Sequence, residues 1–207
     1  RLYAERAALQ DGQEILELGC GWGSFALWAA ERYPGSRITA VSNSSPQREY
    51  IQGECARRGL ANLEVLTADM NAFATERCFD RIVSVEMFEH MRNYELLMSK
   101  IAAWLKPRGR LFVHIFRHRR FAYLFKAEGD DNWLGRHFFT GGIMPSDELL
   151  SHFQKDLRIV GHWLQDGTHY QRTAEAWLAN LDARRAAAAE ALKLLHGVET
   201  RRWVQRW

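Results

Sequence analysis

The sequence predicts an α/β domain built on a doubly wound, mostly parallel β-sheet. Two observations carry this prediction. Apolar, β-branched runs alternate with helical patterns between residues 14 and 115, and the first run ends in closely spaced glycines. At 207 residues, 47% of them apolar, the chain is long enough to bury a core. We therefore expect one domain over residues 1–207, with ligands beyond the carboxyl ends of its strands.

The individual elements follow from periodicity and from the turn residues between them. The predicted strands are 14–18, 37–42, 63–67, 81–85, 110–115 and 157–164. The predicted helices are 1–10, 23–33, 46–58, 93–105, 146–154 and, as one long alanine-rich helix, 172–195. Because the chain has no initial Met and both its ends fall inside helical patterns, we expect it to be a piece of a longer protein.

Residues 117–145 interrupt the alternation of strands and helices. This stretch is irregular, rich in aromatic residues, and contains the sequence Thr-Gly-Gly at 140–142. A loop this long inside a compact domain is usually functional. We therefore expect a lid, or a wall of a substrate site, inserted after the fifth strand and followed by a mainly helical C-terminal segment.

The overall composition limits the functional classes. A formal net charge of +3 does not indicate a nucleic-acid partner. The three cysteines show neither metal-ligand spacing nor a disulfide framework, so we expect no metal site and a reducing, cytoplasmic location. No apolar run reaches the length of a membrane span.

The glycines Gly19, Gly21 and Gly23 follow the first predicted strand at positions i, i+2 and i+4. A dinucleotide fingerprint would place its third glycine at i+5. The pattern Glu-x-Gly-x-Gly-x-Gly after an apolar strand instead resembles the first motif of the class I S-adenosylmethionine (SAM) dependent, Rossmann-like methyltransferases. In such a site the Glu17 carboxylate can accept a hydrogen bond from the amino group of the cofactor, although it could also brace the loop.

Two further strand ends carry candidate cofactor ligands. Ser42 and Asn43, with Gln47 on the next helical turn, form a neutral set for the ribose hydroxyls, where many nucleotide-binding enzymes place an acid. After the third strand, Asp69 could accept a hydrogen bond from the adenine amino group while Met70 packs on the ring. Turn chemistry is the alternative explanation for these two residues.

The fourth predicted strand ends in three ionisable side chains, Glu86, Glu89 and His90. Clustered ionisable groups perturb each other's pKa, which favours acid–base chemistry over the alternative of a structural network. His114, at the end of the fifth strand, reaches the same edge. Glu89 and His90 are adjacent, so both can face one site only if the chain turns or becomes helical there. We also expect the Glu89 carboxylate to raise the pKa of His90.

Longer motifs narrow the resemblance to one family. Residues 86–95, Glu-Met-Phe-Glu-His-Met-Arg-Asn-Tyr-Glu, resemble the signature of the cyclopropane-fatty-acid-synthase-like methyltransferases. Four further stretches resemble the coclaurine N-methyltransferase branch of this family. They are residues 121–123, 138–146, 162–164 and 169–173. The resemblance spans residues 15 to about 177. It implies a SAM-dependent enzyme in which the positions of Glu86, Glu89 and His90 line an amine site.

In the cyclopropane synthases of this family, the positions matching Glu89, His114 and Tyr170 help to hold a bicarbonate that acts as base. This chain keeps all three residues, so the resemblance also allows an anion site. After His114, however, the sequence reads Ile-Phe-Arg-His and not the Thr-Ile-Gly of the synthases, which argues against a lipid substrate.

The sequence suggests three functions that can be tested against each other. The first is N-methylation of a small aryl-alkyl or alkaloid-like amine, with Glu89 and His90 as candidate bases and Glu86 attracting the ammonium group. The second is cyclopropanation or methylation of phospholipid acyl chains, and the third is SAM binding without catalysis. The partners we expect are a small-molecule amine and a second copy of the chain in a homodimer. The family's upstream segment and last strand lie outside these residues, so we expect this stretch alone to bind SAM poorly.

Overall fold

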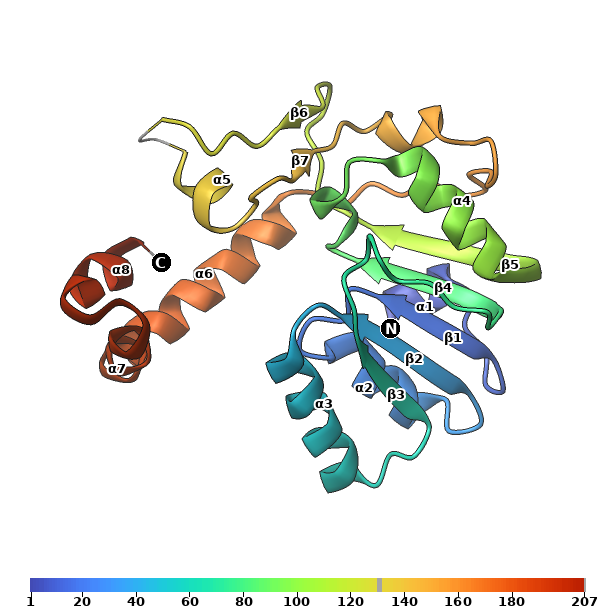
Figure 1. Cartoon of the computed structure of the whole chain (residues 1–207), viewed down its shortest axis with the longest axis horizontal. Helices are drawn as coiled ribbons and strands as arrows, with labels where there is room; N and C mark the ends of the chain where they lie inside the picture. The colour runs from blue at the N-terminus through green and yellow to red at the C-terminus, as the bar shows by residue number, and fades with distance from the viewer. Residues whose placement is uncertain (130–131, 207) are drawn as a thin grey trace. The chain divides into compact units, whose positions relative to one another are not determined.

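The computed structural model describes residues 1–129 and 132–206. Internal contacts group the chain into two compact units, Arg1–Ile159 and Val160–Trp207, and the prediction of a single domain stays a prediction. The first unit holds the sheet and the second is helical (Figure 1). Within the described residues, no helix is both long and apolar enough to span a bilayer.

The central sheet has five parallel strands in the order β3-β2-β1-β4-β5, which confirms the predicted doubly wound fold. Its strands are β1 (Glu14–Leu18), β2 (Arg37–Ser42), β3 (Leu63–Thr67), β4 (Phe79–Val85) and β5 (Leu105–His114). The first three have the predicted bounds, while β4 and β5 begin earlier than predicted. The chain reverses its direction of winding between β1 and β4, the switch point at which such sheets bind ligands.

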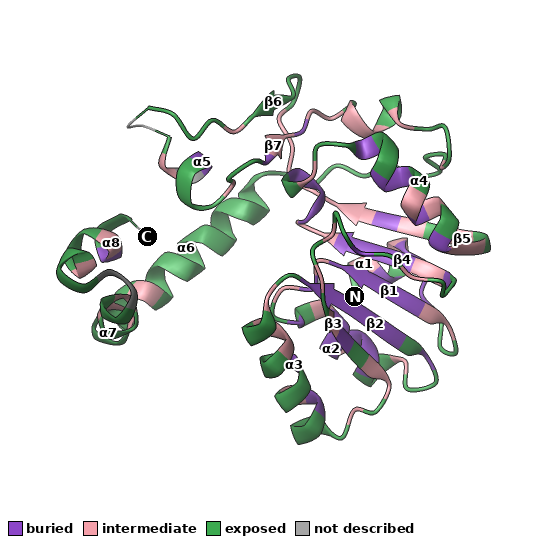
Figure 2. Ribbon diagram, in the orientation of Figure 1, coloured by how far each residue is buried: buried purple, intermediate pink, exposed green. Residues whose placement is uncertain are grey.

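Helices cover both faces of this sheet. They are α1 (Leu2–Arg6), α2 (Ser24–Arg32), α3 (Ser45–Arg58) and α4 (Tyr94–Trp104). Adjacent strand residues point to opposite faces, so Leu16 packs with α4 whereas Ile15 packs with α1 and α2. Burial is concentrated in the strands between these layers (Figure 2). Asn93 begins α4 as its N-cap, since its side chain accepts a hydrogen bond from the Leu96 N–H at 3.1 Å.

Residues 117–145 are mostly irregular, as predicted, but contain three short elements. They are β6 (Tyr123–Leu124), its antiparallel partner β7 (Ile143–Met144) and α5 (Trp133–His137). The predicted helix 146–154 is wrong, because only a 3₁₀ turn forms, η2 (Leu149–His152). The His118 N–H donates to the Pro145 carbonyl at 2.7 Å and holds the chain extended where that helix would begin.

The predicted strand 157–164 is also wrong, because these residues adopt no regular structure. A strand needs a neighbour that satisfies its backbone N–H and C=O groups. Among the described residues the sheet ends at β5, and no strand pairs with this segment.

The second unit contains α6 (Thr168–Ala183), α7 (Arg185–His196), η3 (Gly197–Glu199) and α8 (Thr200–Arg206). The prediction of one helix over 172–195 is wrong, because Arg184 breaks it with φ −119° and ψ 28°. The Arg184 N–H instead closes a tight last turn on the carbonyls of Asn180 and Leu181. α7 packs against α8, where Val204 is buried.

Candidate active site

The three glycines of the turn after β1 differ in how closely other residues approach them. Gly19, Gly21 and Gly23 all adopt positive φ, at 81°, 52° and 79°. A Cβ on Gly19 would lie 2.6 Å from Met87 Cγ, and one on Gly23 would lie 2.7 Å from Ile51 Cγ1. A Cβ on Gly21 would meet nothing within 4 Å. The outer two glycines therefore permit close packing, while the turn at Gly21 leaves room for a ligand beside the backbone.

Glu17 presents a buried carboxyl group just before this turn. It is 2% exposed, and its Oε2 has no hydrogen-bond partner among the described residues. Burial raises the pKa of Glu17 to about 8, and a backbone hydrogen bond from Ala26 lowers it in part. An unsatisfied buried oxygen is costly, and a ligand that brings an N–H group would satisfy it. The carboxyl group thus fits the predicted contact with a cofactor amino group.

At the end of β2, the predicted ribose ligands divide into two kinds. The buried Ser42 hydroxyl donates to Gln47 Oε1 at 2.5 Å and accepts the Ser44 N–H at 3.1 Å, so it braces the start of α3. Asn43 is exposed and Gln47 is half-buried. Contact with a ribose stays a prediction for all three predicted residues, and Ser42 has in addition a clear structural role.

At the end of β3, the Asp69 side chain stabilises a turn. Its Oδ1 accepts hydrogen bonds from the Asn71 N–H at 2.7 Å and from Asn71 Nδ2 at 2.9 Å. Met70 is half-buried and packs against the hydrophobic core. The predicted adenine contacts of both residues stay predictions.

The chain leaves β4 through a strained residue. Glu86 has φ 52°, a left-handed conformation that is uncommon for any residue other than glycine. The 3₁₀ turn η1 (Phe88–His90) follows at once, which confirms that the chain becomes helical at Glu89 and His90. The Tyr94 hydroxyl donates to the Phe88 carbonyl at 2.8 Å and fixes this turn from the side of α4.

Glu86 and His114 are brought together, as the sequence predicts. His114 Nε2 lies 3.2 Å from Glu86 Oε1, and the Glu86 N–H donates to the His114 carbonyl at 2.9 Å. Sequence reasoning missed Tyr3, whose ring centroid is 5.0 Å from that of His114. Burial first, and then the charge of Glu86, raise the pKa of Tyr3. No local pattern around Tyr3 signals this contact, because it depends on how α1 packs against β5.

The pKa of His90 differs from the prediction, and the buried Glu89 lies beside it. Burial raises the pKa of Glu89, and the charge of Glu86 and a hydrogen bond with it raise that pKa further. Glu89 is only 1% exposed, so its surroundings favour the protonated, uncharged form of the carboxyl group. Burial lowers the pKa of His90, although Glu86 acts to raise it. The predicted upward shift is wrong, because burial outweighs the effect of Glu86 and lowers the pKa of His90 overall.

The aromatic segment 117–145 covers one side of this cluster. The rings of His90 and Phe139 are stacked with centroids 5.6 Å apart, and Phe139 stacks in turn on Phe125 at 4.8 Å. The ring of Phe116 meets Phe139 edge-on at 5.3 Å. His90 is exposed as a residue, yet one face of its imidazole is covered. The segment therefore forms an aromatic wall next to the ionisable side chains.

Tyr170 lies in α6 of the second unit, which is described by itself. Its predicted share in an anion site with Glu89 and His114, and the use of bicarbonate there, stay predictions. Among the described residues, no group of three or more His, Cys, Asp or Glu side chains is arranged to hold a metal ion.

The chain matches one known protein family and curated members of it. The family model described as mycolic acid cyclopropane synthetase matches residues 1–203. The chain belongs to this family. Within it, the chain is 45% identical over 184 residues to (S)-coclaurine N-methyltransferase of Thalictrum flavum subsp. glaucum, covering 88% of the chain and 51% of that relative. It is 29% identical over 179 residues to the cyclopropane-fatty-acyl-phospholipid synthase of Escherichia coli K12, covering 86% and 44%.

Solved structures of this family have the same fold. Coclaurine N-methyltransferase bound to N-methylheliamine and SAH superposes with a TM-score of 0.89 at 43% identity, covering 96% of this chain and 58% of that one. The mycolic acid cyclopropane synthase CmaA1 complexed with SAH and CTAB gives 0.76 at 23% identity, covering 99% and 74%, and supports the fold alone. The predicted class I methyltransferase fold is thereby confirmed. The chain spans about half the length of the curated relatives it matches.

Proposed function

We propose that this chain is the catalytic part of a SAM-dependent N-methyltransferase that acts on small aryl-alkyl or alkaloid-like amines. One observation carries the proposal. The glycine turn and the acid–base cluster are in direct contact, since Gly19 packs on Met87, the residue that follows Glu86. A cofactor over the first and an amine beside the second would lie next to each other, as a direct transfer requires.

The residues suited to SAM lie along the carboxyl edge of the sheet. Glu17 would accept a hydrogen bond from the amino group, and the open backbone at Gly21 would lie beside the ligand. Asn43 and Gln47 would hold the ribose. Bound SAM supplies a sulfonium-linked methyl group, which is a ready electrophile. The chain's remaining task is to align the amine and to remove its proton.

The acid–base cluster suits that task. An amine is mostly protonated in neutral solution, and Glu86 would attract the ammonium group. His90, whose pKa is lowered, is neutral and would take the ammonium proton, leaving the nitrogen lone pair free to attack. Protonated Glu89 would hold Glu86 by their hydrogen bond. Phe139 and Phe116 would add cation–π contacts while the substrate is still charged.

The test is an activity screen of the intact protein with isotope-labelled SAM. Benzylisoquinolines and simpler aryl-alkyl amines form one arm, and vesicles of unsaturated phospholipid form the other. We expect N-methylated products in the first arm, identified by mass spectrometry. Label in the acyl chains would favour the lipid reaction instead. SAM binding by calorimetry with no product in either arm would favour a non-catalytic role.

A further inference from the structure

A four-residue turn of the aromatic wall, residues 139–142, rests on the acid–base segment. The Gly142 N–H donates to the Phe139 carbonyl at 2.9 Å and closes the turn. Gly141 occupies its third position with φ 79°, the conformation that a type II turn requires there. The turn therefore has a defined shape of its own and can act as a rigid element.

Three contacts join this turn to the segment that carries Glu89 and His90. The Phe139 ring stacks on the His90 ring with an interplanar angle of 24°. Gly142 is so close to the Glu89 backbone that a Cβ would lie 2.8 Å from the Glu89 carbonyl oxygen. Arg92 Nε donates to the Gly141 carbonyl at 2.6 Å.

The Arg92 bond is the directional one of the three. Stacking of two rings and a close backbone approach allow sliding, whereas a hydrogen bond from a charged guanidinium fixes a distance and an angle. η1 is a single 3₁₀ turn, and such turns are weakly held by their own hydrogen bonds. Without an anchor on the outer side, the exposed His90 ring would be free to change rotamer.

We propose that Arg92 is a positioning residue, which holds the 139–142 turn in place and thereby orients the His90 imidazole and the Glu89 carboxyl group. The inference rests on the proposed function, because it assigns those two groups to the reaction. Arg92 itself lies on the surface and binds the carbonyl of Gly141, so its effect on the reaction is indirect.

The test compares Arg92→Met, which keeps the methylenes and removes the donor, with Arg92→Lys, which keeps a cation able to donate. Arg119→Met, at an exposed arginine of the same wall, is the matched control. At saturating SAM, we expect Arg92→Met to lower kcat about tenfold, in line with loss of a hydrogen bond to a charged group. Lysine should restore most of the rate, and the control should match the wild type.

An NMR titration of His90 supplies a readout independent of turnover. Of the groups that face His90, Glu86 acts to raise its pKa, Glu89 has a raised pKa of its own, and the wall presents the uncharged Phe139. In Arg92→Met the ring should lose its cover, and its pKa should rise toward the ordinary value of 6.5. Gly142→Ala, which forces the turn away from the Glu89 carbonyl, should shift the titration in the same direction.

Two results would overturn the proposal. One is an Arg92→Met variant with wild-type kcat and an unchanged His90 titration. The other is a loss of rate that lysine does not restore and that follows a lower melting temperature, which would mean a merely structural role. If the wild type methylates no amine, the proposed function fails, and the His90 titration still decides whether Arg92 holds the turn.

Discussion

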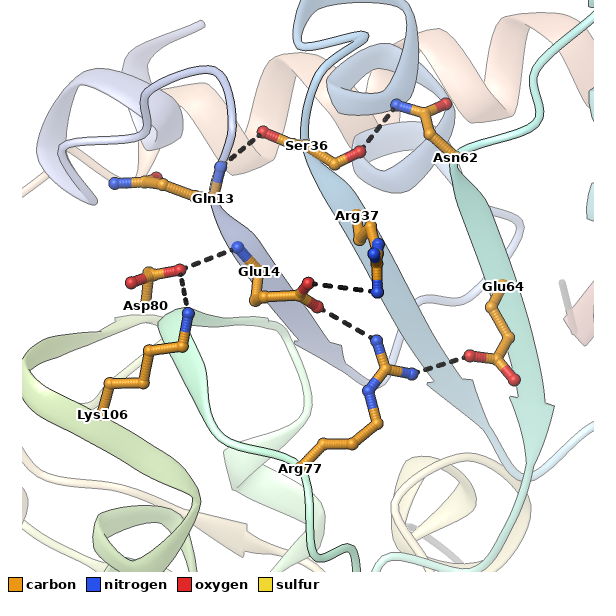
Figure 3. A network of polar contacts seen from close by, with 9 residues as sticks. All are labelled: Gln13, Glu14, Ser36, Arg37, Asn62, Glu64, Arg77, Asp80 and Lys106. Carbon is orange, nitrogen blue, oxygen red and sulfur yellow. Dashed lines mark hydrogen bonds and ion pairs between the residues drawn. The ribbon is translucent and has the colours of Figure 1, made fainter.

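The central sheet uses the same residue types in opposite ways at the amino edge, where its parallel strands begin, and at the carboxyl edge, where they end. At the amino edge, Arg77 bridges Glu14 at 3.1 Å and Glu64 at 2.9 Å, and Lys106 pairs with Asp80 at 2.8 Å (Figure 3). At the carboxyl edge, Glu17 has an oxygen with no hydrogen-bond partner among the described residues, Glu86 has a left-handed backbone, and burial raises the pKa of Glu89.

The pKa shifts express this contrast. Burial acts to raise the pKa of Asp80, yet hydrogen bonds from Lys106 and from the Glu14 backbone lower it overall. The pKa values of Glu17 and Glu89 are raised, with burial as the largest cause. Carboxylates with partners stabilise the fold, whereas buried ones with unmet hydrogen-bonding capacity lower its stability and suit a ligand. The amino edge is therefore structural, and the carboxyl edge is where we expect binding and chemistry.

The largest expected effect is loss of SAM binding in Gly21→Val. A β-branched residue at φ 52° is strained, and its side chain would fill the open space where the ligand should lie. We expect no measurable heat of binding in calorimetry while the circular dichroism spectrum stays that of the wild type. Gly12→Val is the matched control, since Gly12 also has a positive φ, 83°, and open space but lies before β1 at the amino edge. Unchanged affinity in Gly21→Val would remove the ligand from this turn.

The next largest effect concerns His90 as the base. His90→Ala should lower the methylation rate roughly 10²–10⁴-fold, the usual range for loss of a general base, with SAM affinity little changed. Because the neutral imidazole is the active form, the wild-type rate should rise with pH through the pKa of His90, which lies below 6.5. The variant should lose this limb of the pH–rate profile.

The Glu89→Gln variant tests the assignment of His90 as the base. Glutamine can still donate a hydrogen bond to Glu86, so the loss should be smaller than that of His90→Ala if Glu89 acts in its protonated form. Glu64→Gln, at the amino edge, is the control and should keep the full rate. If His90→Ala retained nearly full activity and the same profile, the base would have to be Glu89 or a bound bicarbonate.

The contrast between the edges also shows what a sequence can reveal. The strands 14–18, 37–42 and 63–67 and the glycine turn were predictable, because apolar alternation and local turn residues determine them. Residues 157–164 carry the same local signal but form no strand, since pairing depends on a neighbour elsewhere in the chain. Likewise, residues 172–195 contain no glycine or proline that would mark the break at Arg184.

In the candidate site, too, some features depend on local sequence and others on distant parts of the chain. Glu86, Glu89 and His90 stand out because ionisable residues crowd one strand end, and the turn between them was predictable from their adjacency. The contact of Tyr3 with His114 and the raised pKa of Glu89 were not, because both depend on packing and burial created by distant segments. Local pattern thus points to the candidate residues, and tertiary packing shifts their pKa values.

A smaller effect, with two opposite signs, is expected for Glu17→Gln. The pKa of Glu17 is 4.5 in the unfolded chain and about 8 in the fold, so its contribution to stability is complete below pH 4.5 and is lost as the pH rises through about 8. Glutamine avoids that loss. Free of ligand, the variant should therefore be more stable than the wild type at about pH 9 and differ little at about pH 5, measured by urea denaturation.

The same variant should bind SAM about tenfold more weakly, because an uncharged amide oxygen accepts a hydrogen bond from the amino group more weakly than a carboxylate does. Stability and affinity would then change in opposite directions, as expected for a group kept for binding at the expense of the fold. A Glu17→Gln variant less stable than the wild type at high pH would mean that the carboxylate braces the loop.

The smallest expected effect is that of Arg77→Met at the amino edge. Arg77 and Glu64 have side chains 43% and 56% exposed, and exposed ion pairs are worth about 0–1 kcal/mol each. We expect the free energy of unfolding to fall by less than about 1 kcal/mol, and by still less at high salt, where screening weakens the wild-type pairs. SAM affinity and rate should not change, because the ion-pair partners of Arg77, Glu14 and Glu64, lie at the edge opposite the glycine turn. A variant that kept its stability but lost affinity or rate would show that the two edges are energetically coupled. The division into a structural and a functional edge would then fail.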